Sequence, residues 1–368
     1  LLPEPTAAAI AIGLDKGRDQ TILVYDLGGG TFDISVLKIE NESFAKFTVL
    51  AVNGDHDLGG NDFDSAIREH AIEEFLKQHR IDLRKENPTD SEVRHALQML
   101  TSACERVKVE LSDAEEAYLD LPNFYKGKHL EMAISRRTFE GLIKGLVYKT
   151  KDLVLATIRE AKLDIEDIDR LVLVGGSTKV PLIRRVLADT VKEPFVADNV
   201  DLAVSQGAAI MAANLCSVDE VAAGGADYAP VEIDVTDVVS HPISVGMNDE
   251  RNQLACTTVI QKNSPLPSSG MTLGVASPGQ IIGQLPVFRG DNPDPEKNHY
   301  LGMLTLTFDK SRSHTFIRFE LCLDPNGVLQ VEGATIDLEG RDASELLWMD
   351  PATLKVVRKV RAELKISS

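Results

Sequence analysis

The chain has few cysteines and no pair of them is spaced to hold a metal or to form a redox motif. Its 368 residues contain four cysteines and no C-x-x-C pair, the four being Cys104, Cys216, Cys256 and Cys322. A chain of this length can bury a sufficient core without disulfides. We therefore expect reduced, mostly buried thiols, as in a cytoplasmic protein.

Long apolar runs and an excess of basic charge are also absent. No run approaches the ~20 apolar residues that span a bilayer, and the short run at 7–12 lacks the basic segment of a signal peptide. Acidic residues outnumber basic ones by 57 to 39, which gives a net charge of −18. This field opposes binding to nucleic acid and to anionic membranes. We expect neither as a partner.

The chain is long enough for two or three domains, and its character changes once. The first 215 residues alternate β-rich runs with helical patterns, whereas residues 218–230 are acidic, rich in alanine and glycine, and aperiodic. From about 231 to 339, short β-branched runs alternate with turn clusters such as Asp324-Pro-Asn-Gly. The pattern predicts an α/β domain, a linker and an antiparallel β sandwich.

Individual elements of the first domain are predicted by their periodicity. Two β-rich runs at 21–27 and 31–39 are separated by glycines and predict a hairpin. Helical spacing is found near 61–76, 91–111 and 138–162, and a strand at 170–174 leads into a helix with Pro181 in its first turn. At the end of the chain, Leu354, Val357, Val360 and Leu364 have helical spacing, which predicts a short C-terminal helix over 351–366.

The segment Asp26-Leu-Gly-Gly-Gly-Thr-Phe-Asp carries the most specific chemical signal. Glycines let the backbone approach an anion closely, so Gly28, Gly29 and Gly30 can direct N–H groups at a phosphate, and Thr31 adds a hydroxyl. A carboxylate at Asp26 can hold Mg²⁺ through water. The alternative is a plain hairpin turn, which needs only one or two glycines.

Two further groups of residues are weaker signals by themselves. The turn Gly175-Gly176-Ser177 follows a strand and precedes a helix, a position where glycine is also common for packing reasons. Glu105, Lys108 and Ser112 share one helix face, which is either a ligand-facing stripe or a solvated ion-pair face.

Several segments, in this order, resemble motifs of the DnaK-type 70-kilodalton heat-shock chaperones. They are Glu4-Pro-Thr-Ala-Ala-Ala, Asp26-Leu-Gly-Gly-Gly-Thr-Phe-Asp, Leu58-Gly-Gly-Asn-Asp-Phe-Asp, Cys104-Glu-Arg-Val-Lys-Val-Glu-Leu-Ser and Leu173-Val-Gly-Gly-Ser-Thr-Lys-Val-Pro. The resemblance implies an actin-like, ribonuclease H-like ATPase lobe over 1–217, a linker over 218–234, a β-sandwich peptide-binding domain over 235–345 and the start of a helical lid over 346–368. Because the family's first lobe and its phosphate-binding hairpin are missing from this sequence, we expect a fragment that is inactive as an ATPase by itself.

The resemblance also implies roles for single residues. Glu4 and Asp26 would be catalytic, with Asp26 near Mg²⁺, and ATP or ADP would contact Gly28, Gly29, Gly30, Thr31, Glu105, Lys108, Ser112, Gly175, Gly176, Ser177, Lys179 and Asp201. Lys179 stands where many members have arginine, and Val109 where some have arginine over the base. In the β domain, Met247 and Leu285 match apolar peptide-binding positions, whereas Gly274 and Gly283 replace larger apolar residues.

The family further implies a function and partners. A cytoplasmic heat-shock chaperone would bind unfolded or extended client peptides, with nucleotide controlling peptide affinity, and would act with a J-domain co-chaperone and a nucleotide exchange factor. The unusual glycines keep open a second hypothesis, a regulatory or scaffold relative that binds a partner protein without hydrolysis. A sugar kinase or actin-like filament protein would share the glycine turns but not the β domain.

Overall fold

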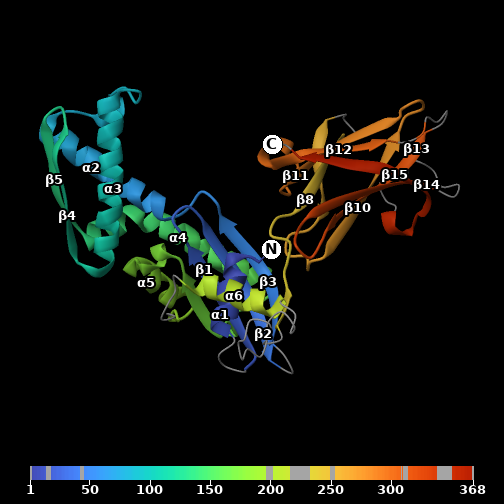
Figure 1. Cartoon of the computed structure of the whole chain (residues 1–368), viewed down its shortest axis with the longest axis horizontal. Helices are drawn as coiled ribbons and strands as arrows, with labels where there is room; N and C mark the ends of the chain where they lie inside the picture. Colours follow the sequence, from blue (N-terminus) through green and yellow to red (C-terminus); the bar gives the residue numbers. More distant parts are fainter. Residues whose placement is uncertain are drawn as a thin grey trace, which may run out of the picture. The chain divides into compact units, whose positions relative to one another are not determined.

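The computed structural model describes residues 2–13, 18–41, 45–195, 202–215, 233–248, 253–307, 309, 314–337 and 350–366. It divides into two compact units, Leu2–Val235 and Thr236–Ser368 (Figure 1), and each is described by itself. Residues 218–232 of the predicted linker, and residues 338–349, lie outside the described residues.

The first unit is built on a five-stranded sheet with the strand order β6-β1-β2-β3-β7. Its strands are β1 (Gln20–Leu27), β2 (Phe32–Asn41), β3 (Ala45–Asp55), β6 (Arg170–Val174) and β7 (Ile233–Thr236). The predicted hairpin is confirmed, since Leu27 pairs with Phe32 across the glycine turn. β6 runs parallel to β1. The glycine turns that follow these two strands therefore lie at the same edge of the sheet.

The helices of this unit are α1 (Glu4–Gly13), α2 (Gly60–His79), α3 (Ser91–Asp113), α4 (Arg136–Glu160), α5 (Pro181–Thr190) and α6 (Ala203–Leu215). α4 packs on β2 and β3 of the sheet, and α6 packs on α1. The Tyr25 hydroxyl of β1 hydrogen-bonds to Thr150 of α4 at 2.7 Å. The neighbouring side chain, Asp26, therefore points to the opposite face, and α1 packs on β1 and β2 there. The predicted helices near 61–76, 91–111 and 138–162 are confirmed as α2, α3 and α4.

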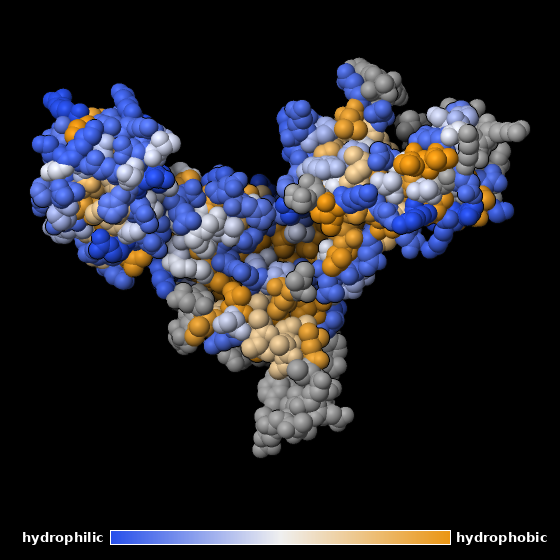
Figure 2. All heavy atoms as spheres, turned by 45° about the horizontal axis from the view of Figure 1, so that its top comes forward, coloured by the Kyte–Doolittle hydropathy of each residue, from blue (hydrophilic) through white to orange (hydrophobic). Residues whose placement is uncertain are grey.

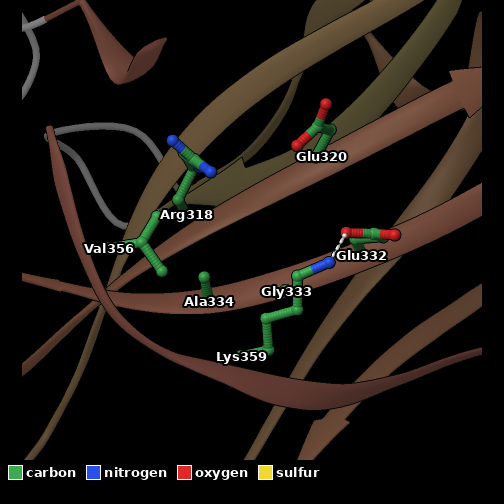
Figure 3. Close-up of a pocket in the computed structure, with 7 residues that line it drawn as sticks. All are labelled: Arg318, Glu320, Glu332, Gly333, Ala334, Val356 and Lys359. Carbon is green, nitrogen blue, oxygen red and sulfur yellow. Dashed lines mark hydrogen bonds and ion pairs between the residues drawn. The ribbon is translucent and has the colours of Figure 1, made fainter. Parts of the chain in front are cut away.

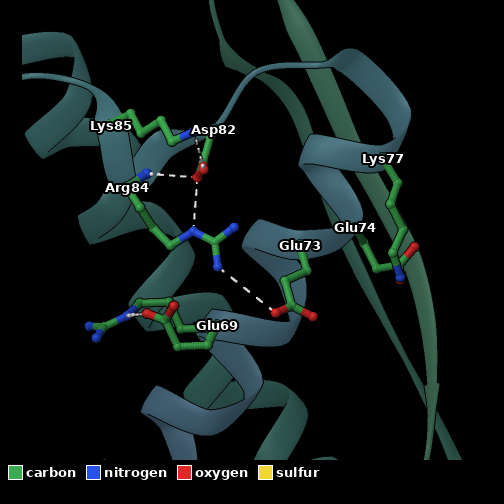
Figure 4. Close-up of polar contacts among 8 residues, drawn as sticks. Glu69, Glu73, Glu74, Lys77, Asp82, Arg84 and Lys85 are labelled. Carbon is green, nitrogen blue, oxygen red and sulfur yellow. Dashed lines mark hydrogen bonds and ion pairs between the residues drawn. The ribbon is translucent and has the colours of Figure 1, made fainter.

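A hairpin of β4 (Glu116–Tyr125) and β5 (Lys128–Ser135) packs beside α2 and α3 (Figure 1). Alternate residues of β4 are buried and exposed, and this part of the surface is mainly hydrophilic in Figure 2. Ion pairs cluster where α2 ends and a 3₁₀ turn begins (Figure 4), for example Arg84 with Asp82 at 2.8 Å. Such exposed pairs contribute little to stability, ~0–1 kcal/mol each.

The second unit consists of antiparallel strands in the order β10-β13-β14-β15-β12-β11-β8-β9. The strands are β8 (Ile243–Asn248), β9 (Leu254–Ile260), β10 (Ser268–Ala276), β11 (Ile282–Arg289), β12 (His299–Thr307), β13 (Thr315–Leu323), β14 (Leu329–Asp337) and β15 (Lys355–Ile366). Val245, Val287 and Leu304 from one half share a core with Ile317 and Leu321 from the other. The predicted antiparallel, β-rich character is confirmed.

The predicted C-terminal helix is wrong. The 3₁₀ turn Pro351–Thr353 leads directly into β15, which pairs with both β14 and β12. Val360, Ala362 and Leu364 are partly buried against the core at every second position, a period typical of a strand. The apolar positions fit a helix as well as a strand, and the two neighbouring strands decide between them. The start of a helical lid is therefore not found at 355–366.

In the part of the chain that the structure describes, no helix combines the length and apolar character needed to cross a membrane.

Candidate functional site

Three glycine-containing turns meet at the edge of the first sheet. The Gly28 carbonyl accepts hydrogen bonds from the backbone N–H of Gly60 at 3.0 Å and from the Ser177 hydroxyl at 2.9 Å. The backbone N–H of Asn61 donates to the Gly29 carbonyl at 2.7 Å. The structure thus brings together three of the sequence motifs, from the β1–β2 turn, the start of α2 and the turn after β6.

Some of these glycines are required by close packing. A Cβ at Gly59 would lie 2.5 Å from the Gly29 carbonyl oxygen, and one at Gly60 would lie 2.4 Å from the Ser177 hydroxyl. Gly175 has φ +84°, and a Cβ there would lie 2.4 Å from the Leu27 carbonyl oxygen. Gly59 and Gly175 thus leave no room for a side chain, and one at Gly60 would displace the Ser177 hydroxyl from the Gly28 carbonyl.

The β1–β2 turn is different, because neither its backbone nor its neighbours demand glycine. None of Gly28, Gly29 and Gly30 has a positive φ, and a Cβ at Gly29 would meet its nearest neighbour, Asn61 Oδ1, at an ordinary 3.7 Å. The absent side chains leave the space over this turn open. Packing inside the chain does not explain why these three residues are glycine. A ligand group that binds close to the backbone N–H groups would explain it.

Carboxylates gather beside this turn. Asp26, at the end of β1, is buried, and its pKa is raised to about 7, first by burial and then by the charges of Glu4 and Asp33. Burial and the charge of Glu4 also raise the pKa of Asp33, although nearby His56 and a hydrogen bond from Thr31 lower it. Glu4 begins α1 and is exposed. Such mutual repulsion is the setting in which a cation binds favourably.

This acidic cluster does not form a complete metal cage. Within the described residues, no group of three His, Cys, Asp or Glu side chains could hold a metal ion. A divalent cation there would need water molecules or oxygens of a ligand to complete its coordination. Mg²⁺ has this habit, since it usually keeps several waters.

Lys108 is engaged inside the chain. Its Nζ donates to the Gly60 carbonyl at 3.1 Å and to Asp64 Oδ2 at 2.9 Å. Only 13% of the Lys108 side chain and 9% of the Asp64 side chain are exposed, and burial raises the pKa of Asp64 although Lys108 opposes this. The lysine thus ties α3 to the first turn of α2, beside the glycine turns.

The remaining predicted residues lie at different distances from the glycine turns and the carboxylates beside them. Glu105 is exposed on α3, and its charge contributes to the raised pKa of Asp64. Ser112 donates to the carbonyl of Lys108 in its own helix at 3.4 Å. Gly176 and Lys179 lie exposed in the 3₁₀ turn after β6. Asp201 lies outside the described residues.

Sequence reasoning missed several residues of this site. Asp33, Gly59, Gly60 and Asn61 lie within motifs that it recognised, but they received no role. Asp64 was missed as well, and its pairing with Lys108 is a tertiary contact. The signal for the first four was present, because each lies within a motif that resembles the family.

In the second unit, Met247 and Leu285 are partly buried against the inner face of the sheet. Gly274 also has a packing explanation, since a Cβ there would lie 2.7 Å from the ring of Phe319. Large apolar side chains are nevertheless exposed on strands and turns of this unit. They include Leu254, Val275, Ile281 and Ile282.

Comparison with known proteins gives a consistent result. A family model described as Hsp70 protein matches residues 1–347. The chaperone protein DnaK of Thermosipho melanesiensis is 39% identical over 313 residues, which cover 83% of this chain and 49% of that protein. DnaK of Thermotoga neapolitana is 38% identical over 314 residues, with the same coverage. DnaK of Halobacterium salinarum is 36% identical over 343 residues, 90% of this chain and 50% of that protein. The chain thus spans about half the length of the curated relatives it matches.

Proposed function

The chain belongs to the Hsp70 family, and we propose that it is part of a heat-shock-type chaperone in which nucleotide state controls peptide affinity. Residues 1–217 would be the second lobe of an actin-like ATPase, residues 218–234 the linker, and residues 235–345 the peptide-binding domain. The chain spans about half the length of its relatives. We therefore propose the activity of a whole chaperone only for a protein that carries both lobes of the ATPase.

The openness of the β1–β2 turn is the observation that supports nucleotide binding best. The fold has room for a Cβ at Gly28, Gly29 and Gly30, and the backbone there does not require glycine, yet all three residues are glycine. Backbone N–H groups exposed at such a turn can bind phosphate oxygens. Thr31 is exposed at the end of the turn and would add its hydroxyl.

The carboxylates fit a Mg²⁺–nucleotide complex. Their repulsion raises the pKa of Asp26 to about 7, so a cation would be favoured beside Asp26 and Asp33. When bound, Mg²⁺ would neutralise phosphate charge. Glu4 would orient water at the same face, while Ser177, Gly175 and Gly176 would border the nucleoside. Lys108 holds the Gly60 turn in position and would leave its charge partly available to the ligand.

Hydrolysis depends on contacts to the phosphates from both sides. In the proposed chaperone, the residues described above would supply these contacts from one side, and the other lobe would supply them from the second side. We therefore expect the 368-residue chain by itself to hydrolyse ATP no faster than background, and a turnover rate like that of a two-lobed Hsp70 would refute this expectation.

Substitution of Gly29 tests the nucleotide site directly. A Cβ fits the fold at this position, so Gly29→Val should melt like the parent yet bind ATP about 10-fold more weakly or worse, ~1.4 kcal/mol, because the side chain obstructs the phosphate. The measurement is calorimetric titration with ATP and Mg²⁺ in a protein that carries both lobes. Gly141→Ala in α4, where a Cβ meets nothing within 4 Å, is the matched control and should bind ATP normally. Equal affinities in both variants would mean that the glycine turn does not contact nucleotide.

Peptide binding distinguishes the chaperone from a scaffold protein. Exposed Ile281 and Ile282, together with Met247 and Leu285, would contact extended apolar segments, and J-domain and exchange-factor partners would set the rate of the cycle. A labelled apolar peptide should be released faster when ATP is added to the two-lobed protein. Binding that ignores ATP would instead favour a regulatory or scaffold role.

A further inference from the structure

A cavity of about 310 Å³ opens at one end of the second unit. It lies where β8 and β14 begin and where β11, β13 and β15 end. Apolar side chains from these strands and from β12 form most of its wall, chiefly Ile243, Leu301, Leu323, Leu329 and Leu364. None of the proposed peptide contacts, Met247, Ile281, Ile282 and Leu285, lines this cavity, and Ile281 and Ile282 lie at the other end of β11 from Arg289. The cavity is therefore distinct from the proposed peptide site.

Arg289 is a charged residue in this apolar wall. On β11 it lies two positions after Val287, which is fully buried in the core, so both side chains face the interior. Arg289 is the last residue of the strand, pairs with Ile243 of β8, and lines the cavity. It is half-buried. Within the part of the chain that the structure describes, its guanidinium has no ion pair or hydrogen bond.

An anion in the cavity would give this arginine a partner that water otherwise supplies. A guanidinium binds a carboxylate through two parallel hydrogen bonds, and the contact is stronger where the apolar wall excludes water. The neighbouring cavity offers apolar surface and a volume at the lower end of the ~300–1,000 Å³ typical of small-molecule sites, which often lie in the mouths of β-barrels. The ligand that satisfies both features has an aliphatic body and one anionic end.

We propose that this cavity binds a small amphipathic carboxylate of the medium-chain fatty-acid class, with its carboxylate on Arg289 and its chain among Ile243, Leu301 and Leu364. This site would operate independently of the proposed nucleotide site. The β domain would then bind two kinds of ligand, an extended peptide and a small amphipathic carboxylate.

A second hollow in the same unit has the opposite character and provides a control. It has a volume of about 270 Å³ and lies over β13, β14 and β15 (Figure 3). Its charges are mixed, with Lys359 paired to Glu332 at 2.8 Å and Arg318 beside them. The Arg318 Nη1 donates to the Pro351 carbonyl at 3.4 Å. Removal of Arg318 changes the charge of the unit as much as removal of Arg289, without touching the proposed cavity.

The test is calorimetric titration of the 368-residue chain with octanoate, octanol and octylammonium, which share one chain and differ in charge. Octanoate should bind best, although the net charge of −18 favours the cation overall. Arg289→Met should weaken octanoate binding by roughly 10-fold and leave octanol unchanged, whereas Arg318→Met should change neither. An excess of the apolar peptide should not displace octanoate.

Leu329→Trp, which would fill part of the cavity that Leu329 lines, should abolish binding of both octanoate and octanol. Thermal melts of each variant show whether it is folded. If Leu329→Trp does not fold, the octanoate titration of Arg289→Met still tests the proposed site. The proposal is overturned if octanoate binds no better than octanol, if Arg289→Met binds octanoate normally, or if the peptide displaces it.

Discussion

The raised pKa of Asp26 makes a prediction about stability that can be tested without any ligand. Its pKa is 3.8 in an unperturbed chain and about 7 in the folded protein. Because the folded value is the higher one, the carboxyl group stabilises the fold when protonated, fully below pH 3.8, and this contribution is lost as the pH rises through 7. A shift of about three pKa units corresponds to ~4 kcal/mol at most, at ~1.36 kcal/mol per unit.

The substitution Asp26→Asn keeps the size of the side chain and removes its ionisation. Relative to the parent, it should stabilise the first unit, and its advantage should grow by ~2–3 kcal/mol between pH 5 and pH 8. Urea unfolding followed by circular dichroism at 222 nm measures this, because the α-helices that the structure describes all lie in the first unit.

Asp55 is the matched control for this experiment. A hydrogen bond with Lys149 lowers the pKa of Asp55, so its carboxylate stabilises the fold above its unfolded pKa. Asp55→Asn should therefore destabilise the protein slightly, by no more than ~1 kcal/mol, and equally at pH 5 and pH 8. The reasoning about Asp26 is refuted if Asp26→Asn destabilises the protein, or if its effect is the same at both pH values.

Three further experiments test the helix packing and the buried ion pair. Gly207→Ala would place a Cβ 1.7 Å from the Ala7 carbonyl oxygen, so it should separate α6 from α1 and lower the free energy of unfolding by ~1–3 kcal/mol or more; an unchanged urea midpoint would contradict the close packing. Gly141→Ala, exposed in α4 with nothing within 4 Å, should raise that free energy by ~1 kcal/mol, and a lower melting temperature would count against it. Lys108→Met leaves Asp64 buried without its cation and should destabilise the protein by ~1–3 kcal/mol. A second substitution in the same chain, Asp64→Asn, should restore most of this loss. Strictly additive effects of the two substitutions would mean that the pair is not coupled.

The helices and the central hairpin of the first unit could be predicted because their signals are local. Apolar residues at three- and four-residue spacing between 91 and 111 fit only a helix, and the structure has α3 there. The glycines after β1 likewise indicated a turn, and the strands on either side pair as predicted. The family motifs, read in order, indicated the family that the comparisons show.

The C-terminal segment shows where such local reasoning fails. Val357, Val360 and Leu364 fit helical spacing, but Val360, Ala362 and Leu364 fit alternation equally well. The choice was made by β12 and β14, which lie on either side of β15 and satisfy its backbone hydrogen bonds. A strand is stabilised by partners distant in sequence, so periodicity over sixteen residues could not determine it.

The sequence by itself determined which residues of the first unit could contact an anion, because glycine runs and carboxylates are local chemistry. Only the tertiary structure decided that Glu4 and Asp33 both act on Asp26, that Lys108 is held by Asp64, and that Arg289 faces an apolar cavity. Charges interact through space over a few ångströms, and their energies depend on burial. Both quantities are set by the packing of segments that lie far apart along the chain.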